Sequence, residues 1–168
     1  MRMLLSTQPP WARMRHALPD GATIDDVRAR FPQVVETPAL APVEYGDDKR
    51  PTNGVVSVPG YIALLNATTH KPISIVRKSY TVVQYADALT LLDGVQGARY
   101  VQAGTYHDDK RAWALAEIEG SNDVRRKYIL LHTGHDGFTG IKALFTSALV
   151  ACWNVLSARL ANNPNMVS

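Results

Sequence analysis

The sequence predicts an α+β fold in which a single antiparallel sheet carries helices on one face. From Val55 onward apolar residues recur with a period of two, which indicates strands. Polar turns at residues 67–72, 107–110 and 120–123 separate these segments. Residues 85–93 and 145–160 instead show helical spacing. The expected order is a hairpin, a helix, a meander of three or four strands and a long C-terminal helix, and one helix-covered sheet is the simplest way to bury these apolar faces.

The long C-terminal helix, residues 145–160, is the most strongly patterned run of the chain. Its apolar stripe comprises Leu149, Cys152, Val155, Leu156 and Leu160. We expect this stripe to cover the sheet, which places the single cysteine in the core. Asn154 lies beside the stripe, where a side-chain amide normally hydrogen-bonds to nearby backbone.

The first fifty-four residues are predicted to contain little regular structure. We expect an irregular N-terminal arm over residues 1–22, anchored on the core by Trp11. Thr23 and Asp26 have the spacing of a capping box, so a short helix begins there, and Pro32 ends it near Arg30. Prolines and glycines make residues 33–54 a predicted loop, with at most one edge strand at residues 33–36.

The central part of the chain supplies the predicted sheet. Residues 61–66 and 73–77 form a hairpin, and a helix follows at residues 85–93 with Ala88, Leu91 and Leu92 facing inward. The meander consists of residues 99–106, 111–118 and 127–132, with residues 138–144 as a last strand. We expect residues 1–168 to form a single domain, with the folded core at residues 23–161 and a frayed tail at residues 162–168.

Composition narrows the class of protein. The 168 residues are 46% hydrophobic with a formal net charge of +3, which fits a globular protein and permits nucleic-acid binding without requiring it. One cysteine rules out an intramolecular disulfide and suits the cytoplasm. No apolar run is long enough for a membrane span and the N-terminus does not resemble a signal peptide, so a cytoplasmic protein without membrane contact is expected.

His132, His135 and Asp136 are the strongest candidates for chemistry. Two histidines three residues apart can chelate zinc, but a zinc site needs further ligands and Cys152 is the only thiol. The alternative is a plain turn, because Asp136-Gly137 is a strong turn dipeptide. Cys152 as a nucleophile would need a base and some exposure, which its place on the buried stripe opposes. We therefore expect no catalytic residue, metal or cofactor, although an enzyme with residues 132–136 as its site remains an alternative hypothesis.

Basic residues at strand ends and turns suggest a binding surface. The candidates for phosphate contacts are Arg77, Lys78, Lys110, Arg111, Arg125, Arg126 and Lys127, with Tyr80 and Tyr106 as candidates for base stacking. Cations that follow a phosphate backbone and aromatic rings that stack on bases are what single-strand binding uses. The plain alternative is that these cations are solvated and the tyrosines fill the core.

Several short motifs, in order, resemble one known family. They are Pro10-Trp11, Leu18-Pro-Asp-Gly-Ala-Thr23, Val58-Pro-Gly-Tyr61, Tyr80-Thr-Val-Val-Gln84, Leu91-Leu-Asp93, Ala103-Gly104, Trp113-Ala-Leu-Ala116, His135-Asp-Gly137, Phe145-Thr146 and Val150-Ala-Cys-Trp-Asn-Val-Leu156. The chain resembles the phage/plasmid-like proteins grouped as domain of unknown function 932, as a shortened member. Leu149 and Trp153 stand where that family carries arginine and glutamine. The resemblance implies a phage, prophage or plasmid origin and a recurring Cys-x-Asn pattern at Asn154, but no established activity.

The order of elements is also similar to the core of phage single-strand annealing proteins, which is a likeness of fold only. Taken together, these features predict a non-enzymatic protein of a phage or mobile element that binds single-stranded nucleic acid, DNA in preference, and that promotes strand annealing. The alternative is an interaction protein that inhibits a host defence complex, in the manner of an anti-CRISPR protein. An uncovered apolar stripe would in addition favour a homo-oligomer.

Overall fold

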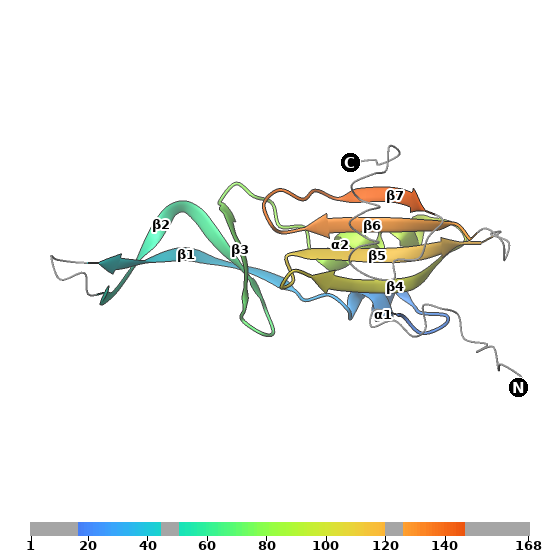
Figure 1. The fold of residues 1–168 in the computed structure, drawn as a ribbon, viewed down its shortest axis with the longest axis horizontal. Helices are drawn as coiled ribbons and strands as arrows, with labels where there is room; N and C mark the ends of the chain where they lie inside the picture. The colour runs from blue at the N-terminus through green and yellow to red at the C-terminus, as the bar shows by residue number, and fades with distance from the viewer. Residues whose placement is uncertain (1–16, 45–50, 120–125, 147–168) are drawn as a thin grey trace, which may run out of the picture.

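The computed structural model describes residues 17–44, 51–119 and 126–146, which form two antiparallel sheets and short helices (Figure 1). In chain order the elements are α1 (Ile24–Arg28), β1 (Val34–Glu44), β2 (Pro51–Asn66), β3 (Pro72–Arg77), α2 (Tyr85–Leu89), the 3-10 helix η2 (Thr90–Gly94), β4 (Ala98–Tyr106), β5 (Arg111–Ile118), β6 (Tyr128–Gly134) and β7 (Lys142–Thr146). Strands β1, β2 and β3 make one sheet, and β4 to β7 make the other in sequence order. The predicted single sheet with helices on one face is therefore wrong.

The four-stranded sheet forms the body of the protein and confirms the predicted meander. Trp113 of β5 lies opposite Gly104 of β4 and His132 of β6, and Leu130 of β6 lies opposite Leu144 of β7. Alternation along β5 sends Ala112, Ala114 and Ala116 to one face and Trp113 and Leu115 to the other. Both faces of the sheet are buried at β5 and β6, which agrees with the continuous apolar run of β6.

The alanine face of this sheet is the one that the helices cover. Val27 of α1 and Tyr85 and Leu89 of α2 belong to the same buried cluster as the β5 alanines. In Figure 1 α2 lies behind the sheet and α1 is seen beside its β4 edge. Small side chains on the sheet allow the helices to approach closely. Within residues 85–93, Ala88 and Leu92 are buried as predicted, but Leu91 is 60% exposed, because the last turn is a tighter 3-10 helix.

The predicted start of α1 is confirmed in detail. The Thr23 amide donates to the Asp26 carboxylate at 2.8 Å, and the Asp26 amide donates to the Thr23 hydroxyl at 3.3 Å. This reciprocal capping box satisfies amides at the first turn that have no partner within the helix. The helix ends at Arg28, with Ala29 as its C-terminal cap, close to the position that Pro32 predicts.

The three-stranded sheet is the largest departure from the sequence prediction. Residues 33–54 are not a loop with one short strand, because residues 34–44 and 51–54 belong to β1 and β2. The register shifts after Pro38 and after Pro42, and these irregularities accommodate residues that cannot donate to a regular ladder. In Figure 1 the β1–β2 pair projects from one end of the four-stranded sheet.

Several predictions fall on residues outside the described ranges. The predicted helix at residues 145–160 begins with Phe145 and Thr146, which instead end β7. Residues 147–168, with Cys152, Asn154 and the tail at residues 162–168, lie outside the described residues, as do residues 1–16 with Trp11, and Arg125. The extent of the single domain stays a prediction. Within the described ranges, no helix is both long and apolar enough to cross a membrane.

Candidate nucleic-acid interface

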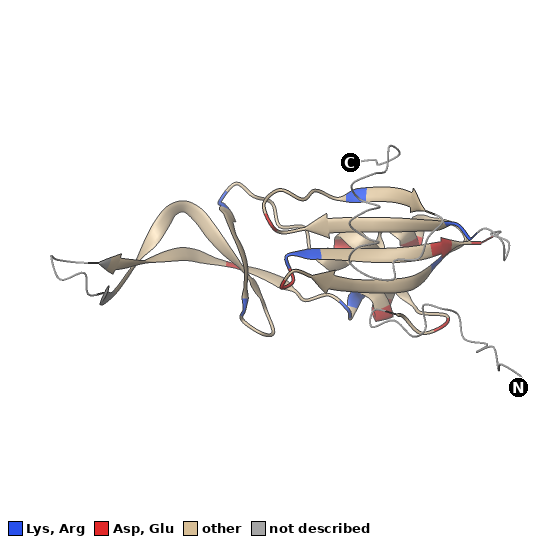
Figure 2. Cartoon of the chain, in the orientation of Figure 1, with Lys and Arg blue, Asp and Glu red and all other residues tan. Residues whose placement is uncertain are grey.

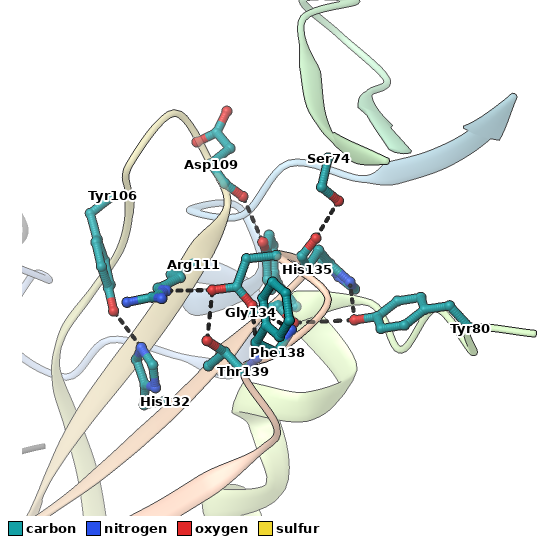
Figure 3. A network of polar contacts seen from close by, with 12 residues as sticks. Ser74, Tyr80, Tyr106, Asp109, Arg111, His132, Gly134, His135, Phe138 and Thr139 are labelled. Carbon is teal, nitrogen blue, oxygen red and sulfur yellow. Dashed lines mark hydrogen bonds and ion pairs between the residues drawn. The ribbon is translucent and has the colours of Figure 1, made fainter. Parts of the chain in front are cut away.

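The two sheets meet at a junction built from β3, the β4–β5 turn and the loop after β6. The Ser74 hydroxyl of β3 donates to the His135 carbonyl in that loop (Figure 3). The Asn66 side-chain amide, at the end of β2, donates to the Asp109 carboxylate at 2.9 Å. Part-buried hydrogen bonds that cross between segments remote in sequence help to hold them in one geometry. The projecting sheet is therefore attached to the body through specific polar contacts.

The β4–β5 turn has an uncommon backbone. His107, Asp108 and Asp109 are consecutive and all have positive φ, at 54°, 55° and 61°, a conformation that costs residues other than glycine some free energy. Contacts to Asp109 hold the turn: the Thr105 hydroxyl donates to its carboxylate and the Tyr85 hydroxyl to its carbonyl, both at 2.6 Å. This turn presents the following Lys110 and Arg111 to the junction.

The loop after β6 is organised by one carboxylate. Asp136 accepts hydrogen bonds from the Phe138 amide at 3.0 Å, from the Thr139 amide at 2.7 Å and from the Thr139 hydroxyl at 2.8 Å, and it pairs with Arg111 at 2.7 Å. Burial alone would raise the pKa of the Asp136 carboxyl, but these donors outweigh burial and hold the pKa well below its usual range. The residue is therefore a charged structural anchor.

Glycines permit the tight path of the same loop. A Cβ at Gly134 would lie 2.9 Å from the Thr139 Cβ and 3.1 Å from the Lys110 carbonyl oxygen, so only glycine fits there without a shift. Gly137 has a φ of 82°, which completes the predicted Asp-Gly turn. The turn alternative for residues 132–136 therefore accounts for the loop conformation. Because of this loop conformation Phe138, which follows Gly137, is held out from the body with 96% of its surface exposed.

His132 and His135 are both buried, and each contacts a different tyrosine. The Tyr106 hydroxyl hydrogen-bonds to Nε2 of His132, and the Tyr80 hydroxyl lies 3.1 Å from Nδ1 of His135 (Figure 3). Burial, together with Arg111 and Lys142, lowers the pKa of His132 to about 4, although Asp136 opposes the shift. Burial also lowers the pKa of His135, against smaller raising effects of Asp136 and the Val83 backbone. Both imidazoles are therefore neutral near pH 7.

The described residues contain no group of three histidine, cysteine or acidic side chains placed to hold a metal ion. The two imidazoles are oriented by separate tyrosines on separate sides of the loop backbone, as Figure 3 shows. A metal site would need convergent ligands. What the arrangement does instead is hold the loop after β6, whose His135 carbonyl accepts a hydrogen bond from Ser74 of β3.

Three surface hollows follow one another along this junction. The first, about 450 Å³, lies between β1 and β2 and is lined by Glu36, Tyr61 and Lys78 among others. The second, about 460 Å³, shares Tyr61 with the first and adds Arg77 and Phe138. The third, about 300 Å³, shares Phe138 and Tyr80 with the second and extends over the glycine-rich loop. We call this series the junction track; aromatic side chains stand between successive hollows.

The predicted basic residues do not gather in one place. Arg77, Lys78, Lys110 and Arg111 lie at the junction, whereas Arg126 and Lys127 precede β6 at the opposite end of the body (Figure 2). Arg111 is paired with Asp136, and Arg126 lies 3.6 Å from the Glu117 carboxylate. Within residues 17–44, 51–119 and 126–146, by contrast, Arg77, Lys78 and Lys110 are exposed and form no ion pair. The structure thus divides the set, and only Arg77 and Lys78 line the junction track.

The predicted stacking residues, Tyr80 and Tyr106, are half-buried and bound to histidines. Two other aromatic residues are better exposed at the junction track, Tyr61 at 42% and Phe138 at 96%. Sequence reasoning missed both. Phe138 carried a signal, because a large apolar residue between Gly137 and Gly140 in a turn has no strand or helix to bury it. No sequence signal distinguished Tyr61, because the residues around it have the pattern of an ordinary strand.

Comparison with known proteins gives one match. No curated protein and no solved structure matches the chain. A family model described as a domain of unknown function (DUF932) matches residues 72–167, more than half of the 168 residues. The match begins at β3 and includes the His135-Asp-Gly137 loop and all four strands of the body. The chain therefore belongs to the DUF932 family.

Proposed function

We propose that this protein binds single-stranded nucleic acid, DNA in preference, along the junction track and without catalytic chemistry. The observation that carries the proposal is the series of three neighbouring hollows that share the exposed Tyr61 and Phe138 as lining residues. A single strand is a linear polymer of flat bases, and proteins hold it with successive stacking platforms along a groove. Double-stranded nucleic acid hides its bases and would not use such platforms.

Charge at the junction track supports an anionic ligand. Arg77 and Lys78 line its hollows, and exposed Lys110 lies in the adjacent turn. The carboxylates of Glu36 and Asp136 also line the junction track. Asp136 is paired with Arg111, so Glu36 is the negative charge that remains to oppose an anionic ligand. Few cations imply few phosphate contacts, so binding should be modest and sensitive to salt. The resemblance to phage/plasmid-like proteins suggests the setting: a phage or mobile-element protein in the cytoplasm of a bacterial host that assists strand annealing.

The test is a fluorescence-anisotropy titration of a labelled oligo-dT against the full chain at several salt concentrations. Phe138→Ala should weaken binding by about tenfold, because stacking contributes about 1–3 kcal/mol per base. Phe145→Ala is the matched control, since Phe145 is an exposed phenylalanine on β7 away from the junction track. Equal affinities of the two variants would contradict stacking on Phe138.

The cations are tested in the same assay. Arg77→Gln with Lys78→Gln should lower the slope of log K against log salt by about 0.7 for each lost phosphate contact. Lys127→Gln, at the opposite end of the body, is the control and should leave the slope unchanged. Absence of binding at low salt would remove the proposal. In that case a protein partner that is recovered from host lysate after nuclease treatment would favour the alternative of a defence inhibitor.

A further inference from the structure

The ladder between β1 and β2 opens at one point into an arch. Pro38 of β1 pairs with Ile62 of β2. The next pair is Leu40 with Ser57, so one residue of β1 faces residues 58–61 of β2. Extra residues on one strand of a pair bend that strand away from its partner, and in Figure 1 β2 bows away from β1. We call residues 58–61 the arch.

Two local features fix the shape of the arch. Gly60 has a φ of 80°, which residues other than glycine rarely adopt. Its carbonyl accepts a hydrogen bond from the Lys78 amide at 2.8 Å, which ties the arch to the residue after β3. The first hollow of the junction track, about 450 Å³, lies between the arch and β1, and we call it the arch hollow. Pockets for small ligands have volumes of about 300–1,000 Å³, so the arch hollow can take one nucleobase with its sugar.

Two opposite charges line the arch hollow without meeting. Glu36 of β1 and Lys78 are both exposed, and both line it. Among the residues that the structure describes, neither takes part in an ion pair. A carboxylate offers only hydrogen-bond acceptors, and an ammonium group offers only donors. The arch hollow therefore suits a neutral group that carries both donors and acceptors better than it suits a phosphate.

Guanine is the base whose edge matches these two charges. Its N1–H and its N2 amino group are neighbouring donors that one carboxylate can accept together, and its O6 acceptor lies beside them. Adenine and cytosine instead place an acceptor next to their amino group, and thymine has one donor between two acceptors. A single strand exposes these edges for recognition. Tyr61, which lines both the arch hollow and the second hollow and is 42% exposed, can stack on the face of the base.

We propose that the arch hollow is a guanine-specific pocket, in which Glu36 accepts from N1–H and the N2 amino group and Lys78 donates to O6. The inference rests on the proposed function, since the guanine then belongs to the single strand held along the junction track. It gives a role in binding to Glu36, whose charge otherwise only opposes an anionic strand. It also assigns Lys78 to the base, which leaves Arg77 as the phosphate contact of this part of the track. A free guanine nucleotide presents the same edge, and the test separates the two sources.

The test is a fluorescence-anisotropy titration of the full chain with labelled oligo-dT strands that carry one central substitution. One dG should tighten binding by about tenfold over the all-dT strand, because a good bidentate contact discriminates between bases by a factor of this order. One dA controls for purine stacking and should gain far less. Deoxyinosine, which lacks the N2 amino group, should fall between dG and dT. A 7-deaza-dG, which keeps the edge that Glu36 reads, should bind as tightly as dG.

Glu36→Gln should abolish the preference for dG, because an amide cannot accept from two donors at once. Its affinity for the all-dT strand should stay the same or rise slightly, since a repelling charge is lost. Glu119→Gln is the matched control, an exposed carboxylate that follows β5, and should keep the preference. Circular dichroism melts of both variants show whether the fold is retained.

The outcomes separate this inference from the proposed function. Equal affinity of the wild type for the dG and dT strands would overturn the guanine pocket and leave single-strand binding intact, and a Glu36→Gln protein that still prefers dG would overturn it as well. If neither strand binds at low salt, single-strand binding fails, and isothermal titration with guanosine monophosphate decides the pocket. Binding that depends on Glu36 and is absent for adenosine monophosphate would make the arch hollow a site for a free guanine nucleotide. No binding of guanosine monophosphate would overturn it.

Discussion

At the scale of single residues, buried histidines make the protein sensitive to acid. His132 is 3% exposed, and burial beside Arg111 and Lys142 lowers its pKa to about 4, against an ordinary value of 6.5. Above pH 6.5 the imidazole is neutral in both the folded and the unfolded chain. As the pH falls from 6.5 to about 4, the unfolded chain binds a proton that the folded chain excludes, so stability is lost across this window.

The prediction is that the free energy of unfolding falls by about 3 kcal/mol between pH 7 and pH 4 through His132 alone. His132→Gln should be less stable at pH 7 but should show a smaller slope in that range. His70→Asn is the control, because His70 is exposed and its φ of 56° suits asparagine. Urea unfolding at a series of pH values provides the measurement, and an unchanged slope in His132→Gln would contradict the prediction.

At the scale of elements, a glutamine side chain extends a strand ladder. The Val34 amide donates to the Gln84 side-chain oxygen, and the Gln84 side-chain nitrogen donates to the Val34 carbonyl, both at 2.9 Å. The Gln84 side chain therefore acts as a one-residue strand partner for Val34, the first residue of β1. It also lies directly before α2, so it connects the projecting sheet to the helical face of the body.

Gln84→Ala should lower the free energy of unfolding by about 1–3 kcal/mol, because two part-buried backbone groups lose their partners. Gln96→Ala removes an exposed glutamine of the loop before β4 and should change stability by less than about 0.5 kcal/mol. Thermal denaturation of the two variants compares them directly. A Gln84→Ala protein as stable as the control would show that water replaces the side chain without cost.

At the scale of the whole molecule, the core lies in the four-stranded sheet. Strands β5 and β6 are central, and nearly all their residues are buried on both faces. The β1–β2 pair, by contrast, contributes exposed side chains along most of its length. Cooperative stability should therefore be concentrated in the body.

Hydrogen exchange followed by mass spectrometry should show the slowest amides in β5 and β6. Their exchange requires the global unfolding that exposes Leu115 and Leu130, which are fully buried. Amides of the edge strand β7 should exchange faster and serve as the internal comparison. Slower exchange in β7 than in β6 would place the stable core elsewhere.

Local signals account for the parts of the fold that the sequence predicted. The Thr23–Asp26 spacing, the polar turns at residues 67–72 and 107–110 and the alternation along β5 each involve neighbours within a few residues, and each is confirmed. The predicted turn at residues 120–123 lies outside the described residues. The β1–β2 ribbon was missed because its prolines and glycines are typical of loops. They are tolerated there because edges and register shifts leave those positions without an obligatory ladder bond.

The candidate site likewise has parts that local sequence determines and parts that only tertiary packing determines. The sequence alone determined that Asp136-Gly137 forms a turn, that basic residues fall at strand ends, and that the chain resembles its family. Only the tertiary structure decided which of those residues meet, since β3, the β4–β5 turn and the loop after β6 converge through contacts such as Ser74 with His135 and Asn66 with Asp109. Lys127 and Arg77 look alike in the sequence, but Arg77 ends β3 at the junction of the two sheets and Lys127 precedes β6 at the opposite end of the body. Their separation depends on strand direction and sheet order, which are set by the packing of segments remote in sequence.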